Sequence, residues 1–328
     1  MSSEGPLAQL RDGAKVERVL LCRRVERLTT RTGQPYLRLE LADRSGAVRA
    51  YLFGSAAERG AGLRSGLAVS VRGSYTVHPT FGPQLKLESV EPAAPGSYNP
   101  AELERCSPAD LARLEARFWE LVEAIGNDHL RRLVETVLDP QGEVWAAFRE
   151  APAAKQNHQP YRHGLLEHTV SVAAGVEAIA NAEAGIDRDL ALAGALLHDI
   201  GKVDAYRLEE GVAELTDSGR LQGEIPLGYY RVRRAIEELP GFPPPLAEAL
   251  LHIILSHHGA LEHGSPVVPA TKEAILVHAL DNLNAKLGGF DRLLEQLPAG
   301  TVWSGFDRAL GTSVYLAGQT AAGAAKNP

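Results

Sequence analysis

The spacing of apolar residues changes once along the chain, near residue 100. Before that point, apolar residues alternate with polar ones in short runs, and an Asp-Arg-Ser-Gly turn at 43–46 separates two of the runs. Alternation with period two, bounded by turn residues, predicts β-strands. The pattern predicts five strands, over residues 16–28, 36–43, 47–53, 68–77 and 84–90, with a short helical piece at 55–63.

Five strands with a helical interruption between the third and fourth is the plan of the OB-fold, a small β-barrel that binds single-stranded nucleic acids. We therefore predict an OB-type nucleic-acid-binding domain over residues 15–92, after a flexible tail at 1–14. Arginines around the polar 29–35 connection and nearby aromatic rings are its candidate contacts, because cations grip phosphates and rings stack on bases. These candidates are Arg23, Arg24, Arg27, Arg31, Tyr36, Tyr51 and Phe53. The alternative is structural: small barrels need aromatic cores, and basic strands can be solvated edges that resist aggregation.

After the strands, a segment rich in Pro, Gly and Ser at 91–100 is typical of a linker, and helical spacing begins. Residues 107–125 carry apolar side chains at helical intervals, with Ser107 as the predicted N-cap. Two further helices are predicted over 129–138 and 144–154. We assign residues 93–150 to this linker and its connecting helices.

Two strongly apolar helices each end in a polar pair. In one, over the stretch 190–202, the apolar run stops at His198-Asp199, and Gly201 is the predicted C-cap. The other ends at His257-His258, with a glycine after it. A buried helix gains nothing from a terminal imidazole or carboxylate unless something binds it, although one such pair alone could be a hydrogen-bonded core pair.

Two more helices add the same residue types. His168 lies on an amphipathic helix, and Asp281 lies mid-helix with His278 and Asn284 one turn away on either side. Several apolar helices exposing His or Asp at one level predict a metal site inside a helical bundle. Imidazole and carboxylate ligands without Cys fit Mn, Fe, Co, Ni or Zn better than a structural zinc.

The order His168, His198-Asp199, Asp281 resembles the H…HD…D signature of the HD metal-dependent phosphohydrolase superfamily. Five further segments resemble, in order, those of the YhaM-type 3′-to-5′ exoribonucleases: PAAKQNHQPYRHGLLEHT, LLHDIGKV, SGRLQGEIPLG, LSHHGALEHGSP and ALDNLNAK. This resemblance covers roughly residues 152–310, and the predicted barrel is compatible with the OB domain of that family. The expected fold is thus multidomain α and β: a five-stranded OB-type β-barrel followed by an all-α HD-domain helical bundle over 151–316.

The resemblance implies a hydrolase: a metal-dependent 3′-to-5′ exonuclease that cleaves phosphodiester bonds of single-stranded RNA to nucleoside 5′-monophosphates, with single-stranded DNA as a further candidate substrate. One alternative is an HD-type phosphohydrolase of small nucleotides or cyclic dinucleotides with a regulatory OB domain. The other is a strand-binding protein with a vestigial HD fold, which the intact His/Asp set argues against.

Site roles follow from the resemblance. His168, His198, Asp199 and Asp281 are expected to hold a first metal ion, and Asp199 to bridge to a second at His257 and Glu224. The family normally carries His where this chain has Glu224, so the second site depends on whether the carboxylate ligates metal. Lys202, Asp199 and His258 are the candidate catalytic residues. Lys155 and His158 are expected at the mouth of the site, in contact with nucleic acid.

Manganese is the favoured cofactor, as one or two ions, with Fe, Co, Ni and Zn as alternatives. The chain has neither a P-loop nor a dinucleotide fingerprint, so no need for ATP or NAD is expected. Residues 1–95 hold 14 Lys and Arg against 9 Asp and Glu, a net charge of +5, leaving −12 for the rest of the chain. A basic module joined to an acidic body is consistent with a strand-gripping domain that feeds a metal site.

The remaining expectations concern the cell and the ends of the chain. No apolar run approaches 18 residues and no signal-peptide pattern is present, so neither membrane insertion nor export is expected. The 2 Cys form no disulfide framework, which makes the cytoplasm the default location. The small-residue tail at 317–328 is expected to be disordered. A homo-oligomer is compatible with the sequence.

Overall fold

The computed structural model describes residues 6–7, 10–30, 32–54, 62–78, 82–103, 107, 109–154, 159–209, 212–297 and 301–318. The chain divides into two compact units. Residues 107–208 and 213–288 form a helical unit, and residues 1–106, 209–212 and 289–328 form a unit around a β-barrel. Each unit is described below by itself.

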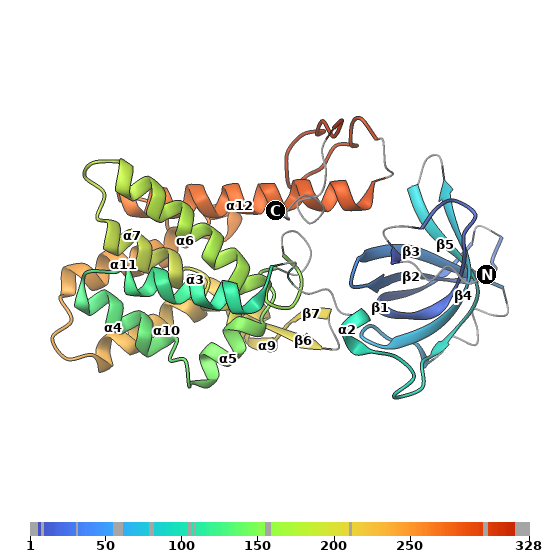
Figure 1. Ribbon diagram of the computed structural model, residues 1–328, viewed down its shortest axis with the longest axis horizontal. Helices are drawn as coiled ribbons and strands as arrows, with labels where there is room; N and C mark the ends of the chain where they lie inside the picture. The colour runs from blue at the N-terminus through green and yellow to red at the C-terminus, as the bar shows by residue number, and fades with distance from the viewer. Residues whose placement is uncertain are drawn as a thin grey trace. The chain divides into compact units, whose positions relative to one another are not determined.

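A closed barrel forms in the N-terminal part, with the strand order β1-β2-β3-β5-β4 (Figure 1). The strands are β1 (Lys15–Thr29), β2 (Pro35–Asp43), β3 (Gly46–Phe53), β4 (Ala68–His78) and β5 (Gly82–Pro92). Neighbours pair antiparallel except β3 and β5, which pair in parallel. All five predicted strands are confirmed, and this order and closure are those of an OB-type barrel. The predicted helical piece lies mostly outside the described residues, which omit 55–61.

The inward row of each strand supplies the barrel core. Apolar residues at alternate positions are buried while their neighbours are half-buried or exposed, as period-two patterning requires. Leu7, which precedes the first strand, is also buried, and its backbone N–H donates to the Asp43 carboxylate at 2.9 Å.

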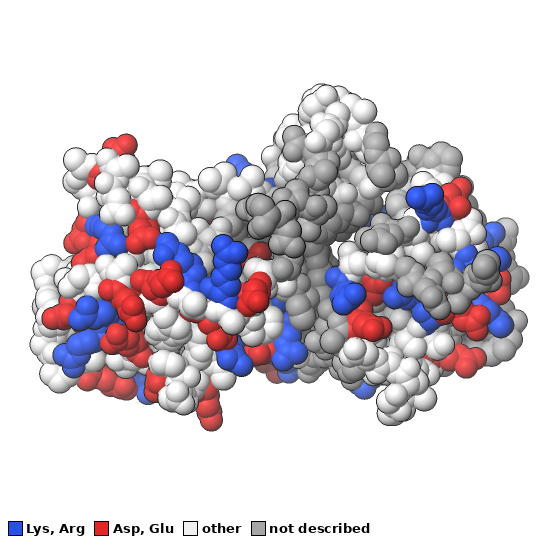
Figure 2. All heavy atoms as spheres, in the orientation of Figure 1, with Lys and Arg blue, Asp and Glu red and all other residues white. Residues whose placement is uncertain are grey.

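The helical unit buries one continuous apolar core. Its helices are α3 (Leu111–Glu123), α4 (Asp128–Val137), α5 (Glu143–Glu150), α6 (Gly164–Ala182), α7 (Arg188–Leu197), α8 (Lys202–Ala205), α9 (Asp217–Gln222), α10 (Glu224–Glu238), α11 (Pro244–Ser256) and most of α12 (Lys272–Gln296), with a 3₁₀ turn η3 (Leu261–His263). A short helix, α2 (Pro100–Leu103), belongs to the barrel unit. The face drawn in Figure 2 shows acidic and basic side chains interspersed over the helices.

Several local details differ from the sequence predictions. Helix α3 is capped by Asp110, which accepts from the Arg113 N–H, whereas Ser107 accepts from Ala109 in the turn before it. The predicted N-cap was therefore wrong by three residues, because several capping residues precede the helix and only one lies in register. The helical region also holds a two-stranded sheet, β6 (Tyr206–Glu209) and β7 (Val212–Leu215), which the sequence did not predict.

The polar pairs follow immediately after two strongly apolar helices, α7 and α11. α7 ends at Leu197 and α11 at Ser256, so His198 and His257 are their C-cap residues. Gly201 is not the predicted left-handed C-cap, because its φ is −68°. Glycine is required there because a Cβ would lie 2.0 Å from the Glu224 carbonyl oxygen, where the start of α10 packs against this turn.

The C-terminal described segment, 301–318, folds back on itself through the bridges Trp303↔Tyr315 and Asp307↔Thr312. Of the predicted disordered tail, residues 319–328 lie outside the described residues. None of the described helices is both long and apolar enough to span a membrane.

Candidate functional site

Three side chains from three helical segments meet in the core of the helical unit. His168 comes from α6, His198 from the end of α7 and Asp281 from α12, and one ligand atom of each lies within 4.8 Å of the others. His168 Nε2 is 3.3 Å from His198 Nε2 and 3.2 Å from Asp281 Oδ1. Both imidazoles are buried and the Asp281 side chain is 14% exposed, so the fold has largely withdrawn three potential ligands from water.

Asp199 lies between this group and a second one. Its Oδ2 is 3.3 Å from the Nε2 atoms of both His168 and His198, while its Oδ1 is 3.5 Å from His257 Nε2. The second group consists of Asp199, His257 and His258, again within 4.8 Å of one another. One carboxylate therefore points an oxygen atom at each group, which is the arrangement of a bridging ligand.

The second group has buried acceptor atoms that a bound cation would satisfy. Asp199 Oδ1 and His257 Nε2 are buried and have no hydrogen-bond partner within the described part of the chain. Their separation of 3.5 Å exceeds that of a good hydrogen bond, yet it suits two ligands of one ion. A buried, unsatisfied acceptor pair is costly unless a metal or proton fills it. The imidazole and carboxylate donors match divalent transition ions.

Lys202 and Glu224 flank Asp199. Lys202 is 4% exposed, and its Nζ is 2.7 Å from Asp199 Oδ2 and 3.9 Å from Glu224 Oε1. Glu224 Oε1 is in turn 3.4 Å from His258 Nε2, and burial together with the nearby Glu224 carboxylate raises the pKa of the Tyr206 hydroxyl to about 12. Glu224 is thus adjacent to the second group, where its nearest neighbours are cationic side chains and a phenol.

Burial and charge shift the pKa values of this cluster in opposite directions. Burial alone would lower the pKa of His168, but the carboxylates of Asp199 and Asp281 outweigh it and raise the pKa to about 9. Burial opposes ionisation of Asp199 too, yet Lys202 and His198 hold its pKa well below the usual range. For His257 burial prevails and lowers the pKa, so its ring stays neutral and able to ligate a cation.

The barrel brings a second set of predicted residues together. On the outer face of β1, β2 and β3, alternate residues form cross-strand rows: Glu26 lies opposite Arg38, which lies opposite Tyr51, and in the next row Tyr36 lies opposite Phe53. The Tyr36 and Phe53 rings stack with centroids 5.2 Å apart, and those of Tyr51 and Phe53 with centroids 6.3 Å apart. Stacked, partly exposed rings beside guanidinium groups are the features that single-strand-binding barrels use.

The predicted arginines divide between the two sides of β1. Arg24 shares the outer face, but Arg27 belongs to the alternate row and donates to the Leu63 carbonyl at 3.2 Å. Arg23 sits at a β-bulge and is half-buried. Arg31, Lys155 and His158 lie outside the described residues. The nucleic-acid role of all these residues stays a prediction.

Sequence reasoning missed several neighbours of these sites. Arg38 and Arg49 lie on the outer face with Arg24, and strand alternation around the 43–46 turn could have indicated them. Tyr206 and the contact of Asn284 with His168 Nδ1, at 2.8 Å, depend on packing between distant segments and left no local signal.

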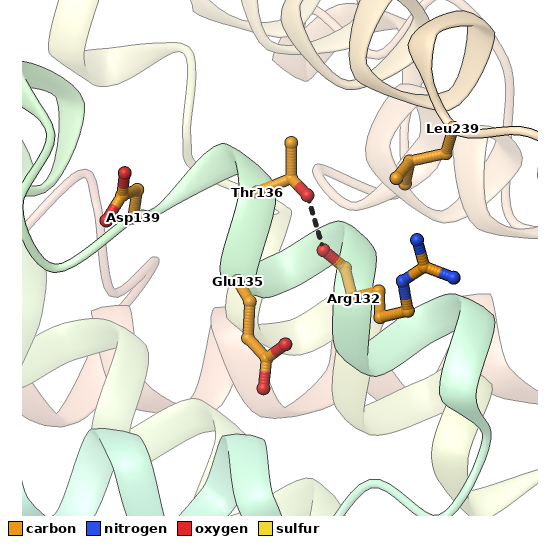
Figure 3. A pocket seen from close by; sticks show the side chains of 5 residues that line it. All are labelled: Arg132, Glu135, Thr136, Asp139 and Leu239. Atoms are coloured by element: carbon orange, nitrogen blue, oxygen red, sulfur yellow. Dashed lines mark hydrogen bonds between the residues drawn. The ribbon is translucent and has the colours of Figure 1, made fainter.

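A shallow surface hollow elsewhere on the helical unit involves none of the candidate residues. Figure 3 shows its lining of Arg132, Glu135, Thr136, Asp139 and Leu239, where the Thr136 hydroxyl donates to the Arg132 carbonyl. The charged residues that line this hollow are exposed, and no buried polar side chain among the described residues points into it. We therefore assign it no binding or catalytic role.

Comparison with known proteins agrees with this geometry. The HD domain family matches residues 165–286, which include all four members of the H…HD…D set. The chain is 33% identical over 291 residues to the 3′-5′ exoribonuclease YhaM of Geobacillus sp. (strain WCH70), an alignment that covers 88% of this chain and 87% of that protein. It is 32% identical to the 3′-5′ exoribonuclease YhaM of Bacillus subtilis (strain 168), with 88% and 90% covered.

Among solved structures, the second OB-fold domain of replication protein A from Methanococcus maripaludis aligns with 29% of this chain and 98% of its own length. Identity is 14% and the TM-score 0.24, so the OB assignment rests on strand order and barrel closure.

Proposed function

The chain belongs to the YhaM family of 3′-5′ exoribonucleases, and from that premise we propose that it degrades single-stranded RNA from the 3′ end by metal-dependent hydrolysis, releasing nucleoside 5′-monophosphates. The observation that supports this most is the meeting of His168, His198, Asp199 and Asp281 within one HD domain. The names of the relatives favour RNA over the small-nucleotide alternative. Single-stranded DNA is proposed as a second substrate, because stacking and phosphate contacts do not require the 2′-hydroxyl.

The residues that would hold the cations are assigned from their positions. His168, His198, Asp199 and Asp281 would hold the first ion, and Asp199 with His257 and either His258 or Glu224 the second. When bound, a divalent cation activates water for attack and neutralises charge on the phosphoryl oxygens. We propose Mn²⁺, since mixed imidazole and carboxylate ligands suit it.

The remaining chemistry belongs to the protein. Lys202 keeps a positive charge within 2.7 Å of Asp199, where an ammonium can attract a phosphate. His258 is partly exposed, and burial, which would lower its pKa, is outweighed by Glu224, so its pKa is raised. If Glu224 rather than His258 is the ligand of the second ion, His258 Nε2 is available to hold a proton for the departing 3′-oxygen. The rings on the outer face of the barrel would stack on bases of the strand.

The direct test is the degradation of 5′-labelled single-stranded RNA with Mn²⁺, resolved on a sequencing gel. A ladder that descends from full length is expected, and a chelator should stop it. Asp199→Ala should slow the reaction by at least about two orders of magnitude, since a metal contributes several kcal/mol to such reactions. Asp217→Ala, which changes an acid in the first turn of α9, is the matched control. An intact strand beside hydrolysed small nucleotides would contradict the proposal.

A further inference from the structure

Each histidine in the two groups has one ring nitrogen engaged by a fixed partner. His198 Nδ1 lies 2.8 Å from the Ala195 carbonyl, and His257 Nδ1 lies 2.8 Å from the Ile254 carbonyl. Both residues follow the last turn of a helix, where the backbone carbonyls have no intrahelical N–H donor. A carbonyl three residues back therefore holds the Nδ1 proton and leaves the Nε2 lone pair available to a cation.

His168 cannot use this arrangement. It is the fifth residue of α6 (Gly164–Ala182), where the preceding carbonyls accept bonds from the helix itself. Its Nδ1 lies instead 2.8 Å from Asn284 Oδ1, a side chain 116 residues away on α12. Asn284 follows Asp281 by three residues, so one face of α12 contacts both ring nitrogens of His168.

The Asn284 amide also contacts a third residue. Its Nδ2 donates to Ser171 Oγ at 2.8 Å, and Ser171 lies one turn after His168 on α6. With the NH₂ group directed at the hydroxyl, the amide oxygen faces His168 Nδ1, and an amide oxygen can only accept. Ser171, Asn284 and His168 thus form a chain of hydrogen bonds that ends at the candidate metal centre.

We propose that Asn284 is a positioning residue that keeps the proton of His168 on Nδ1 and so presents Nε2 to the first cation, with Ser171 holding the amide in place. The inference deepens the proposed function and rests on it only in requiring that the centre binds a divalent cation. Carbonyl and carboxylate partners of ligating histidines commonly change metal affinity by about 10- to 100-fold when they are removed.

The amide also suits the charge of the site. Two carboxylates, from Asp199 and Asp281, already lie 3.3 and 3.2 Å from His168 Nε2. A neutral acceptor on the other nitrogen orients the ring without adding a further negative charge. An aspartate at this position would keep the acceptor, so it serves as the conservative replacement.

The test is Mn²⁺ binding to the metal-free full-length protein, measured by isothermal titration calorimetry without RNA. Asn284→Leu is expected to weaken the tighter binding step by about 10- to 100-fold, and Asn284→Asp to restore it. Asn282→Leu makes the same change at an exposed position of α12 and should bind as the wild type does. Thermal unfolding of the metal-free variants checks that each is folded.

Wild-type Mn²⁺ affinity in folded Asn284→Leu would overturn the inference, as would equal losses in Asn284→Leu and Asn284→Asp. If Asn284→Leu does not fold, Ser171→Ala replaces it, because alanine is favourable at this exposed helical position. That variant should bind Mn²⁺ several-fold more weakly, and unchanged affinity would overturn the inference too. Since RNA is absent from the titration, failure to degrade RNA would count against the proposed function alone.

Discussion

Asp199 is the residue on which the geometry of the candidate centre depends. Its two oxygens are directed at different histidine groups, and Lys202 Nζ lies 2.7 Å from one of them. Charge compensation in a buried position makes this carboxylate ionised, and an ionised carboxylate is a ligand for two ions. Neighbouring positions in the sequence therefore have separate roles. His198 faces one group, Asp199 faces both groups, and Lys202 neutralises the charge of the Asp199 carboxylate.

The His168 proton gives a prediction about pH. Its pKa of about 9 in the metal-free fold lies above the unfolded value of about 6.5, so its stabilising contribution is complete below pH 6.5 and is lost as the pH rises through 9. The melting temperature of metal-free protein should fall across this range. His168→Gln should reduce that fall, and the difference between the two melting curves measures the contribution of this residue. Parallel curves would contradict the assigned pKa.

Glu224, at a position where the resemblance leads us to expect His, gives a second prediction. Glu224→Ala should lower metal content and reduce the rate by roughly tenfold, with partial rescue by excess Mn²⁺. Glu224→His should stay active but shift its preference toward Zn²⁺ or Ni²⁺, because imidazole is a softer ligand than carboxylate. Elemental analysis and the Mn²⁺ dependence of the rate are the measurements.

The exposed acid Glu262 in η3 supplies the control, as Glu262→Ala. If metal content and rate curves of the Glu224 variants superimpose on those of the wild type, Glu224 is no ligand. Its contacts with Lys202 and His258 would then be ion pairs only.

At the scale of elements, the outer face of the barrel carries arginines that can attract phosphates and an acid that partly neutralises them. Glu26 lies between Arg24 and Arg38 on the outer face of β1 and β2 and pairs with both guanidinium groups. Surface ion pairs contribute at most about 1 kcal/mol to stability, so this acid is not needed for folding. It does offset the positive charge that a phosphate backbone would meet.

Glu26→Gln should therefore tighten binding of single-stranded RNA a few-fold at low salt, while Arg38→Ala should weaken it. Fluorescence anisotropy with a labelled oligonucleotide and the inactive Asp199→Ala background measures this without degradation. Glu88→Gln is the matched control, because Glu88 also pairs with two cations, Lys15 and Arg72. Equal effects of the Glu26 and Glu88 changes would show that the outer face has no special role.

Across the whole molecule, charge is divided unequally: residues 1–95 carry a net charge of +5 and the rest −12. Phosphate contacts release counterions, so binding of a long strand should weaken as salt rises. Replacing Arg24, Arg38 and Arg49 with alanine should make the slope of log K against log salt shallower by about 2. Hydrolysis of a dinucleotide, whose single phosphodiester is the bond being cleaved, should be unchanged. An unchanged slope would show that the strand does not bind to this face.

The sequence alone determined the barrel strands, the apolar helices and the residue types of the centre. Strand alternation predicted all five barrel strands, and apolar helices that end in His198-Asp199 and His257-His258 predicted buried polar termini. These predictions succeed because periodicity and helix termination depend on neighbours a few residues away.

Only the tertiary structure decided which atoms meet. Asp110 rather than Ser107 caps α3, Arg27 and Arg24 lie on opposite rows of β1, and Asn284 approaches a histidine 116 residues earlier. Each depends on register or on helix rotation, which packing of distant segments sets and local pattern does not encode. The direction of an imidazole nitrogen, and hence the chemistry of the centre, is fixed only when the helices pack together.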